Sequence, residues 1–125
     1  MKNQWQLLKD VKEKGLDEIE ASADVPTDSL WFSGHFPGEP ILPGVALVHL
    51  AEQAIVRLAL EKGEDIQLSG LKKVRFTQPV RPGEKLSVMI QSSGESAEIF
   101  YSFKIICQEK VVCSGLIVAK RGKKP

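Results

Sequence analysis

The sequence predicts an α+β fold in which a curved antiparallel sheet wraps around one long central helix. Two patterns predict it. The segment between Pro43 and Gly63 is long, apolar and bracketed like a helix, and the chain after Gly63 alternates apolar and polar residues with the period of two that is typical of strands. The length of 125 residues suits one domain, so residues 1–125 are expected to form a single core.

Charge and composition exclude several functional classes. The 17 basic and 16 acidic residues give a net charge of +1, so the global balance favours neither nucleic acid nor an anionic membrane as a partner. Residues 1–14 have no continuous apolar core of the kind found in signal peptides or membrane anchors, and a cytoplasmic protein is therefore expected. Cys107 and Cys113 are too few for a disulfide scaffold and lack the spacing of a zinc site, so we expect no metal and no cofactor.

The N-terminal part is predicted to contain a short helix and a strand. Residues 1–15 form the helical segment, with Gly15 as its left-handed cap. Residues 16–25 alternate apolar and polar side chains for most of their length, which indicates a strand that Pro26 ends. The apolar residues that recur at roughly helical spacing in the first segment are Trp5, Leu7, Leu8 and Val11.

A shaped loop is predicted between this strand and the long helix. Residues 34–44 contain six of the 17 glycines and prolines of the chain, and regular structure cannot form there. Aromatic and aliphatic residues are interleaved with them, and a purely solvated connection would not carry so much apolar surface. The loop is therefore expected to pack against the domain.

The long helix is bracketed by Pro43, which suits the first helical position, and by Gly63, which suits the position just past the end. Apolar residues cover most of its circumference, so the helix is expected to be wrapped on several sides. It is not expected to span a membrane, because Glu52 and Arg57 fall in mid-segment. The polar residues form one stripe at i, i+4 spacing: His49, Gln53, Arg57 and Glu61.

Four strands are predicted after Gly63, near residues 67–78, 84–94, 96–107 and 110–120. Turn signals lie between them, and consecutive strands are therefore expected to be antiparallel neighbours. The turn at Gln108-Glu109 would place Cys107 opposite Lys110 and Cys113 opposite Lys104, a register that excludes a disulfide. The basic residues 121–125 are expected to form a solvated tail.

Candidate chemistry lies on either side of the helix start. The two histidines, His35 in the shaped loop and His49 in the helix, are the only side chains suited to proton transfer near neutral pH. A lone histidine is more often structural, but the glycines and prolines around His35 fix the backbone beside a titratable ring. The unpaired N–H groups of Gly44 and Val45, at the positive end of the helix dipole, suit a carbonyl oxygen that gains negative charge. Alternatively, Gly44 merely permits close packing.

Three segments carry a resemblance to a known family. His35–Val45 resembles the HFPGxPxxPGV signature of the hot-dog-fold 3-hydroxyacyl-acyl-carrier-protein dehydratases of the FabZ/FabA type, residues 70–84 resemble their second signature, and residues 110–121 resemble their last strand. The resemblance runs from about Trp31 to Arg121. It implies the hot-dog fold, a pair of subunits that make two sites, and removal of water from a 3-hydroxyacyl thioester in fatty-acid-type synthesis.

The resemblance also implies roles for single residues. His35 is the expected base that takes the proton from the carbon next to the thioester carbonyl, and the amide of Gly44 is the expected donor to that carbonyl oxygen. An imidazole of ordinary pKa suits a base that works near neutrality. Substrate-binding roles are implied for Phe36, Pro43 and Val45.

The chain departs from the family at position 49. Family members carry a Glu or Asp there, fourteen residues after the base, and this acid helps the 3-hydroxyl group to leave as water. Here His49 could serve as an imidazolium, because two coupled histidines tend to share one positive charge. Glu52, about 60° around the helix, could replace it. Alternatively, dehydration is lost and the acyl pocket survives for binding, which Gln53, at the place of a family Gln, mildly favours.

The expected partners follow from the same reading. They are an acyl thioester borne by an acyl carrier protein, and a second copy of the chain in a homodimer or a higher oligomer of dimers. The alternative functions are an acyl-thioester hydrolase and a non-catalytic subunit that binds acyl thioesters or their carrier. The basic residues that could receive an acidic carrier, although a solvated strand face explains them equally well, are Lys72, Lys73, Arg75 and Arg81.

Overall fold

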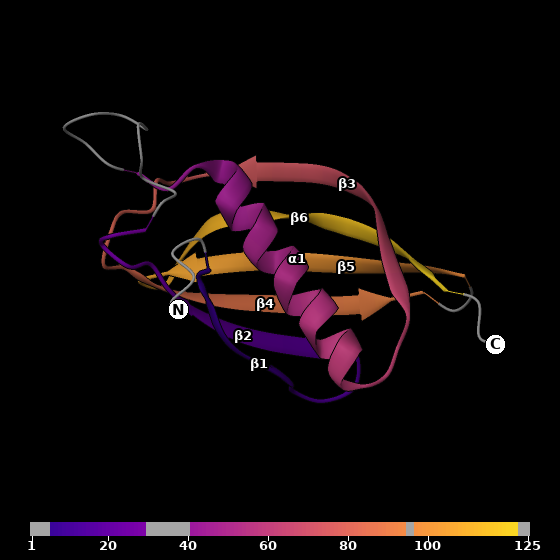
Figure 1. Ribbon diagram of the computed structural model, residues 1–125. Helices are drawn as coiled ribbons and strands as arrows, with labels where there is room; N and C mark the ends of the chain where they lie inside the picture. The colour runs from indigo at the N-terminus through magenta and orange to yellow at the C-terminus, as the bar shows by residue number, and fades with distance from the viewer. Residues whose placement is uncertain (1–5, 30–40, 95–96, 123–125) are drawn as a thin grey trace.

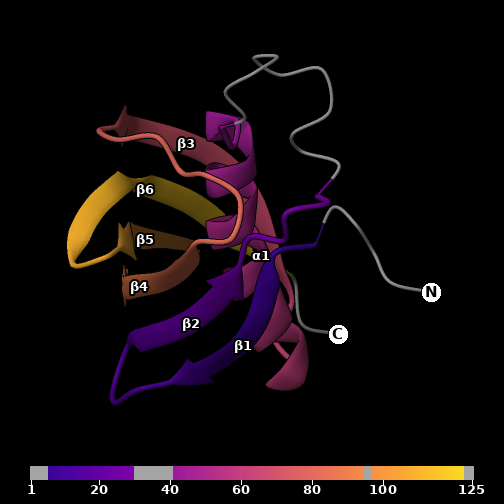
Figure 2. The same ribbon diagram turned by 90° about the vertical axis from the view of Figure 1, so that its left-hand side faces the viewer.

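The computed structural model describes residues 6–29, 41–94 and 97–122, and in this part of the chain one long helix lies across the concave face of a curved six-stranded sheet (Figure 1). Seen from the side, the sheet curls around the helix, with β1 at one edge and β3 at the other (Figure 2). The predicted α+β fold is confirmed. The elements in chain order are β1 (Leu8–Glu13), β2 (Glu18–Asp24), α1 (Gly44–Glu61), β3 (Ile66–Phe76), β4 (Lys85–Ser93), β5 (Glu98–Cys107) and β6 (Lys110–Arg121).

The sheet is antiparallel throughout and has the strand order β1-β2-β4-β5-β6-β3. Consecutive strands are neighbours from β4 to β6, as predicted, but β3 and β4 are not. The chain after β3 does not turn back as a hairpin, because Val80 is fully buried and its carbonyl accepts a hydrogen bond from the Leu42 amide at 2.7 Å. The Pro82-Gly83 turn is then hydrogen-bonded to the residue that follows β2, because the Gly83 amide donates to the Val25 carbonyl at 2.7 Å. β3 pairs instead with β6, at the far edge.

The predicted N-terminal helix is wrong within the described residues, where Leu8–Glu13 is strand β1. Its backbone pairs with β2, and the hydrogen bonds gained from that neighbour outweigh the weak helical spacing of the side chains. Gly15, at a φ of 102°, belongs to the turn between β1 and β2 rather than to a helix cap. Trp5 lies outside the described residues.

Helix α1 supplies one side of the core. Its buried residues face alternate side chains of the sheet, including the fully buried Val88, Ile105 and Ile117. Pro43 is the residue before the first helical position rather than that position itself, and Gly63, at a φ of 71°, follows the C-terminal cap as predicted. No helix in residues 6–29, 41–94 and 97–122 is both long and apolar enough to cross a membrane.

Both cysteines are buried thiols on the inner side of the last hairpin. Cys107 lies opposite Lys110, as predicted, whereas Cys113 lies opposite Ile105 and not Lys104. The pairing shifts by one residue between Ile105 and Ile106, and sequence spacing gives no sign of this irregularity. The two thiols are free, as expected.

Candidate active site

The start of α1 opens into an apolar hollow of about 580 Å³, which we call the N-terminal hollow. Three predicted site residues, Pro43, Gly44 and Val45, lie in its wall. The amides of Gly44 and Val45 belong to the first turn, where a helix leaves its N–H groups without intrahelical acceptors, and no described side chain caps them. The remaining lining residues are Ile41, Leu42, Leu47, Phe76, Thr77, Gln78 and Pro79.

The ring of Phe76 lies directly against Gly44. A Cβ atom at position 44 would stand 2.7 Å from Cζ and 2.8 Å from Cε1 of this ring, closer than carbon atoms approach in packed proteins. A side chain at position 44 would have to displace the Phe76 ring, so the glycine permits close packing here, and its role as a donor stays a prediction. Gly44 is also the first helical residue, so its amide has no intrahelical acceptor.

A second hollow, of about 410 Å³, lies along the outward side of α1, and we call it the helix-face hollow. It contains the other three predicted residues of the helix: His49, which is exposed, and Glu52 and Gln53, which are half-buried. Both edges of the curved sheet contribute to it. The remaining lining residues are Gln6 and Leu8 at β1, Val56, Arg57 and Leu60 on α1, and Leu68 on β3.

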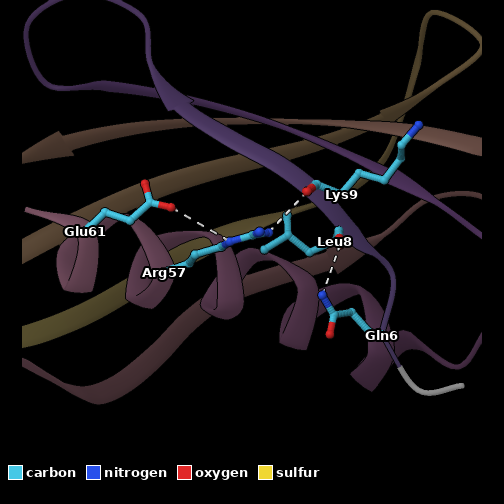
Figure 3. A network of polar contacts seen from close by, with 5 residues as sticks. All are labelled: Gln6, Leu8, Lys9, Arg57 and Glu61. Atoms are coloured by element: carbon cyan, nitrogen blue, oxygen red, sulfur yellow. Dashed lines mark hydrogen bonds and ion pairs between the residues drawn. The ribbon is translucent and has the colours of Figure 1, made fainter. Parts of the chain in front are cut away.

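Arg57 fixes one wall of the helix-face hollow. Its Nη1 donates a hydrogen bond to the Lys9 carbonyl in β1 at 3.2 Å, and its Nε lies 4.0 Å from Oε1 of Glu61 (Figure 3). Just before β1, the side-chain Nε2 of Gln6 donates a hydrogen bond to the Leu8 carbonyl at 3.3 Å. Arg57, a member of the polar stripe predicted on the helix, thus has a structural role, because its side chain connects α1 to the edge strand β1.

The six described site residues fall into two separate groups. Gly44 and His49 are five positions apart, which places them about 140° apart around the helix axis, and they line different hollows. Val45, one turn before His49 on the same side of the helix, lines only the N-terminal hollow. His35 and Phe36 lie outside the described residues, so their roles stay predictions.

The outward side of this region is unusually apolar. Of the eight large hydrophobic side chains that are exposed in the described chain, five lie on α1 or β3, and the helix is therefore less completely wrapped than predicted. Several exposed apolar side chains on neighbouring elements are typical of binding or subunit interfaces. The five residues are Val45, Val56, Leu60, Leu71 and Phe76.

A basic group lies on β3 just before Phe76. The strand has a bulge between Lys72 and Arg75, and Lys73 within it has a φ of 56°. The bulge leaves Lys72, Lys73 and Arg75 exposed, and none of them forms an ion pair in the described part of the chain.

Two residues that line the hollows were not predicted from the sequence: Phe76 and Leu68. Both lie on β3, and no spacing rule connects this strand with the helix that it faces.

The described residues hold no group of three or more His, Cys, Asp or Glu side chains arranged to bind a metal ion. Neither Cys107 nor Cys113 lines either hollow, although Cys113 pairs with Phe76, which lines the N-terminal hollow. Burial raises the pKa of Cys113 to about 11, and burial together with a hydrogen bond to Glu84 raises the pKa of Cys107 to about 11. High pKa values keep both thiols protonated and poorly nucleophilic, so neither is suited to covalent catalysis.

Comparison with known proteins defines the class. The 3-hydroxyacyl-[acyl-carrier-protein] dehydratase FabZ of Syntrophobacter fumaroxidans is 33% identical over 112 residues, which cover 85% of this chain and 76% of the relative. The dehydratase heterocomplex ApeI:P from Xenorhabdus doucetiae contains a chain with a TM-score of 0.70 and 23% identity, and the match covers 97% of this chain and 100% of that one. A thioesterase from Haemophilus influenzae has a TM-score of 0.69 and 22% identity, covering 90% and 77%.

These matches, with one helix held in a curved antiparallel sheet, define a hot-dog fold of the dehydratase class. The chain belongs to the ApeI-like family, whose description is "ApeI dehydratase" and whose model matches residues 11–116.

Proposed function

We propose that this protein removes water from a 3-hydroxyacyl thioester to give the 2-enoyl thioester. The observation that carries the proposal is the opening of α1 at Gly44 into an apolar hollow, directly after the signature segment that contains His35. An uncapped helix start in apolar surroundings is suited to hold a carbonyl oxygen while negative charge develops on it. The relationship to FabZ dehydratases supports the same reaction.

The reaction proceeds by abstraction of a proton from C2 and loss of water from C3. The imidazole of His35 takes the proton from C2, and the electron pair moves toward the thioester carbonyl, whose oxygen accepts a hydrogen bond from the Gly44 amide. The C2–C3 double bond then forms as the bond from C3 to its hydroxyl oxygen breaks. The leaving oxygen takes a proton from an acid and departs as water. Phe36, Pro43 and Val45 contact the acyl group.

His49 is the acid of this proposal. As an imidazolium it donates the proton that the family's carboxylate would donate. Glu52 is the second candidate, because it lines the same hollow and is half-buried. Gln53, beside them, binds the substrate. Replacing His49 by Glu is expected to preserve or raise the rate of enoyl formation.

The site is shared between two subunits. In one chain Gly44 and His49 line different hollows, so a complete site needs residues from a second chain, and the exposed apolar side of α1 and β3 supports an interface there. We infer a homodimer or an assembly of dimers. The ApeI:P heterocomplex provides the competing arrangement, in which an unlike chain takes the second position. Sedimentation of the purified chain as a stable monomer at micromolar concentration would contradict the homodimer.

The substrate is linked to an acyl carrier protein. The basic group on β3 is exposed, has no ion-pair partner in the described chain, and leads directly to Phe76 in the N-terminal hollow. A cationic surface beside the site suits an acidic carrier, because charge complementarity steers the encounter.

Thioester hydrolysis is the second candidate, supported by the fold of the Haemophilus influenzae thioesterase. The two reactions and simple binding are separated by one incubation with a 3-hydroxyacyl thioester. Enoyl absorbance without free thiol is the expected result. Free thiol without enoyl product would indicate hydrolysis, and neither product would indicate a binding subunit. Either of these two outcomes would overturn the proposed dehydration.

A further inference from the structure

The half-exposed ring of Phe76 is not explained by packing alone. Phe76 is the last residue of β3 and is 53% exposed, although its ring edge is in contact with Gly44. A phenyl ring that served only the core would be expected to bury most of its surface. Here its remaining surface forms part of the wall of the N-terminal hollow.

Backbone hydrogen bonds hold the Cα of Phe76 in place. Phe76 pairs with Cys113 of β6, and the next residue, Thr77, donates its amide to the Val112 carbonyl at 3.0 Å. The Thr77 hydroxyl donates to the carbonyl of Val111. The Cα of Phe76 therefore cannot retreat without breaking the end of the β3–β6 pairing, which keeps this side chain beside Gly44.

The position of the ring has a steric consequence for a bound acyl group. Three ring atoms, Cζ, Cε1 and Cε2, would lie within 3.1 Å of a Cβ atom built on Gly44, so the ring occupies the space beside the Cα of this residue. Because Gly44 and Phe76 line the same hollow, we take a thioester whose carbonyl oxygen accepts a hydrogen bond from the Gly44 amide to lie with its C2 carbon beside this ring. An unbranched C2 presents only hydrogens on that side, whereas a methyl branch adds a carbon where the ring already stands.

We propose that Phe76 is a specificity-determining residue, which admits acyl thioesters that are unbranched at C2 and rejects those with a C2 branch. The inference rests on the proposed function, because it takes the Gly44 amide as the carbonyl donor. It extends that proposal by assigning a substrate class and a residue outside the signature segment.

The test compares binding of two matched ligands, unbranched and 2-methyl-branched 3-hydroxyacyl pantetheine analogues in which a methylene replaces the thioester sulfur. Wild-type protein is expected to bind the unbranched analogue at least about tenfold more tightly, the scale on which one methyl group is discriminated in a pocket. Phe76→Ala is expected to reduce this ratio below about threefold. Met89→Ala, a change of similar exposure on the outer side of the sheet, should keep the wild-type ratio.

Phe76→Leu provides a second variant with a smaller apolar side chain, should the alanine variant fail to fold, and it too should lower the ratio. Wild-type discrimination retained in folded Phe76 variants would overturn the role of this ring and leave the proposed function standing. If wild-type protein binds neither analogue, the acyl site itself fails, and the role of Phe76 fails with it.

Discussion

Gly44 and His49 lie on one helix, five residues apart, and line different hollows. Their separation of about 140° around the axis follows from the geometry of an α-helix and no side-chain rotation removes it. Under the proposed mechanism, in which one substrate contacts both the Gly44 amide and a His49 side chain, we expect this His49 to come from a second chain. This relationship leads to the first prediction.

Co-expression of His35→Ala and His49→Ala chains should restore activity that neither homodimer has. If each site combines His35 of one subunit with His49 of the other, a mixed dimer has one intact site, and random pairing recovers about one quarter of wild-type activity. The measurement is enoyl formation by the purified mixture. Mixed dimers that form but remain inactive would place both histidines of a site in the same chain.

The contact between Gly44 and Phe76 predicts a coupled effect on stability. Gly44→Ala alone should lower the free energy of unfolding by about 1–3 kcal/mol, because the added Cβ overlaps the ring. Phe76→Ala removes the overlap, so the double variant should be more stable than the sum of the single changes by at least about 1 kcal/mol. Urea unfolding of the four proteins measures this coupling. Strict additivity would mean that the ring is not what requires glycine at position 44.

Cys107 predicts a loss of stability at alkaline pH. Its Sγ donates to Oε2 of Glu84 at 3.0 Å, and its pKa is raised to about 11, with burial as the larger cause and Glu84 as the second. A raised pKa means that the folded state favours the neutral thiol. This stabilisation is complete below the pKa of an unfolded cysteine, about 8.5, and is lost as pH rises toward about 11.

The matched control is Cys107→Ser, whose hydroxyl still donates to Glu84 and does not ionise in this range. The free energy of unfolding of wild-type protein should fall more steeply between pH 8.5 and 11 than that of the serine variant. Parallel pH profiles would show that this thiol contributes nothing to the alkaline loss. Cys113 titrates in the same direction in both proteins and cancels in the comparison.

Charge reversal of the β3 bulge tests carrier recognition. Lys72→Glu with Lys73→Glu should raise the KM for a carrier-linked substrate about tenfold at low salt, and the effect should shrink as salt screens the charges. The KM for the same acyl group on pantetheine alone should stay unchanged. Lys12→Glu, an exposed change at the opposite edge of the sheet, is the control. An equal effect on both substrates would place the lysines at the acyl site instead of a docking surface.

The sequence patterns predicted most of the fold, and the failures have physical causes. Period-two alternation located β2 and the four later strands, and Pro43 and Gly63 located the helix ends to within one residue. β1 was taken for a helix because pairing with β2, a tertiary interaction, decides its conformation. The partner of β3 was assigned incorrectly because Val80 buries the connection that looked like a hairpin turn.

The sequence predicted the part of the candidate site that is formed by consecutive residues, and it did not predict the part formed by residues far apart in the chain. Pro43, Gly44 and Val45 are consecutive and line one hollow together. Phe76 was missed because its contact with Gly44 joins residues 32 positions apart, through a strand that returns to the helix start only in the folded sheet. The grouping of His49 with Glu52 and Gln53 follows from helical spacing, and the same spacing places His49 about 140° from Gly44 around the helix axis.

The proposed dehydration depends most directly on His35, and one rate comparison tests it. Wild-type protein and His35→Ala, both shown to be folded by thermal unfolding, are incubated with a 3-hydroxyacyl thioester on a carrier protein while enoyl absorbance is followed. We expect enoyl product with wild-type protein and none above background with the variant. An equal rate in the two proteins, or no enoyl product from wild-type protein, would contradict the account.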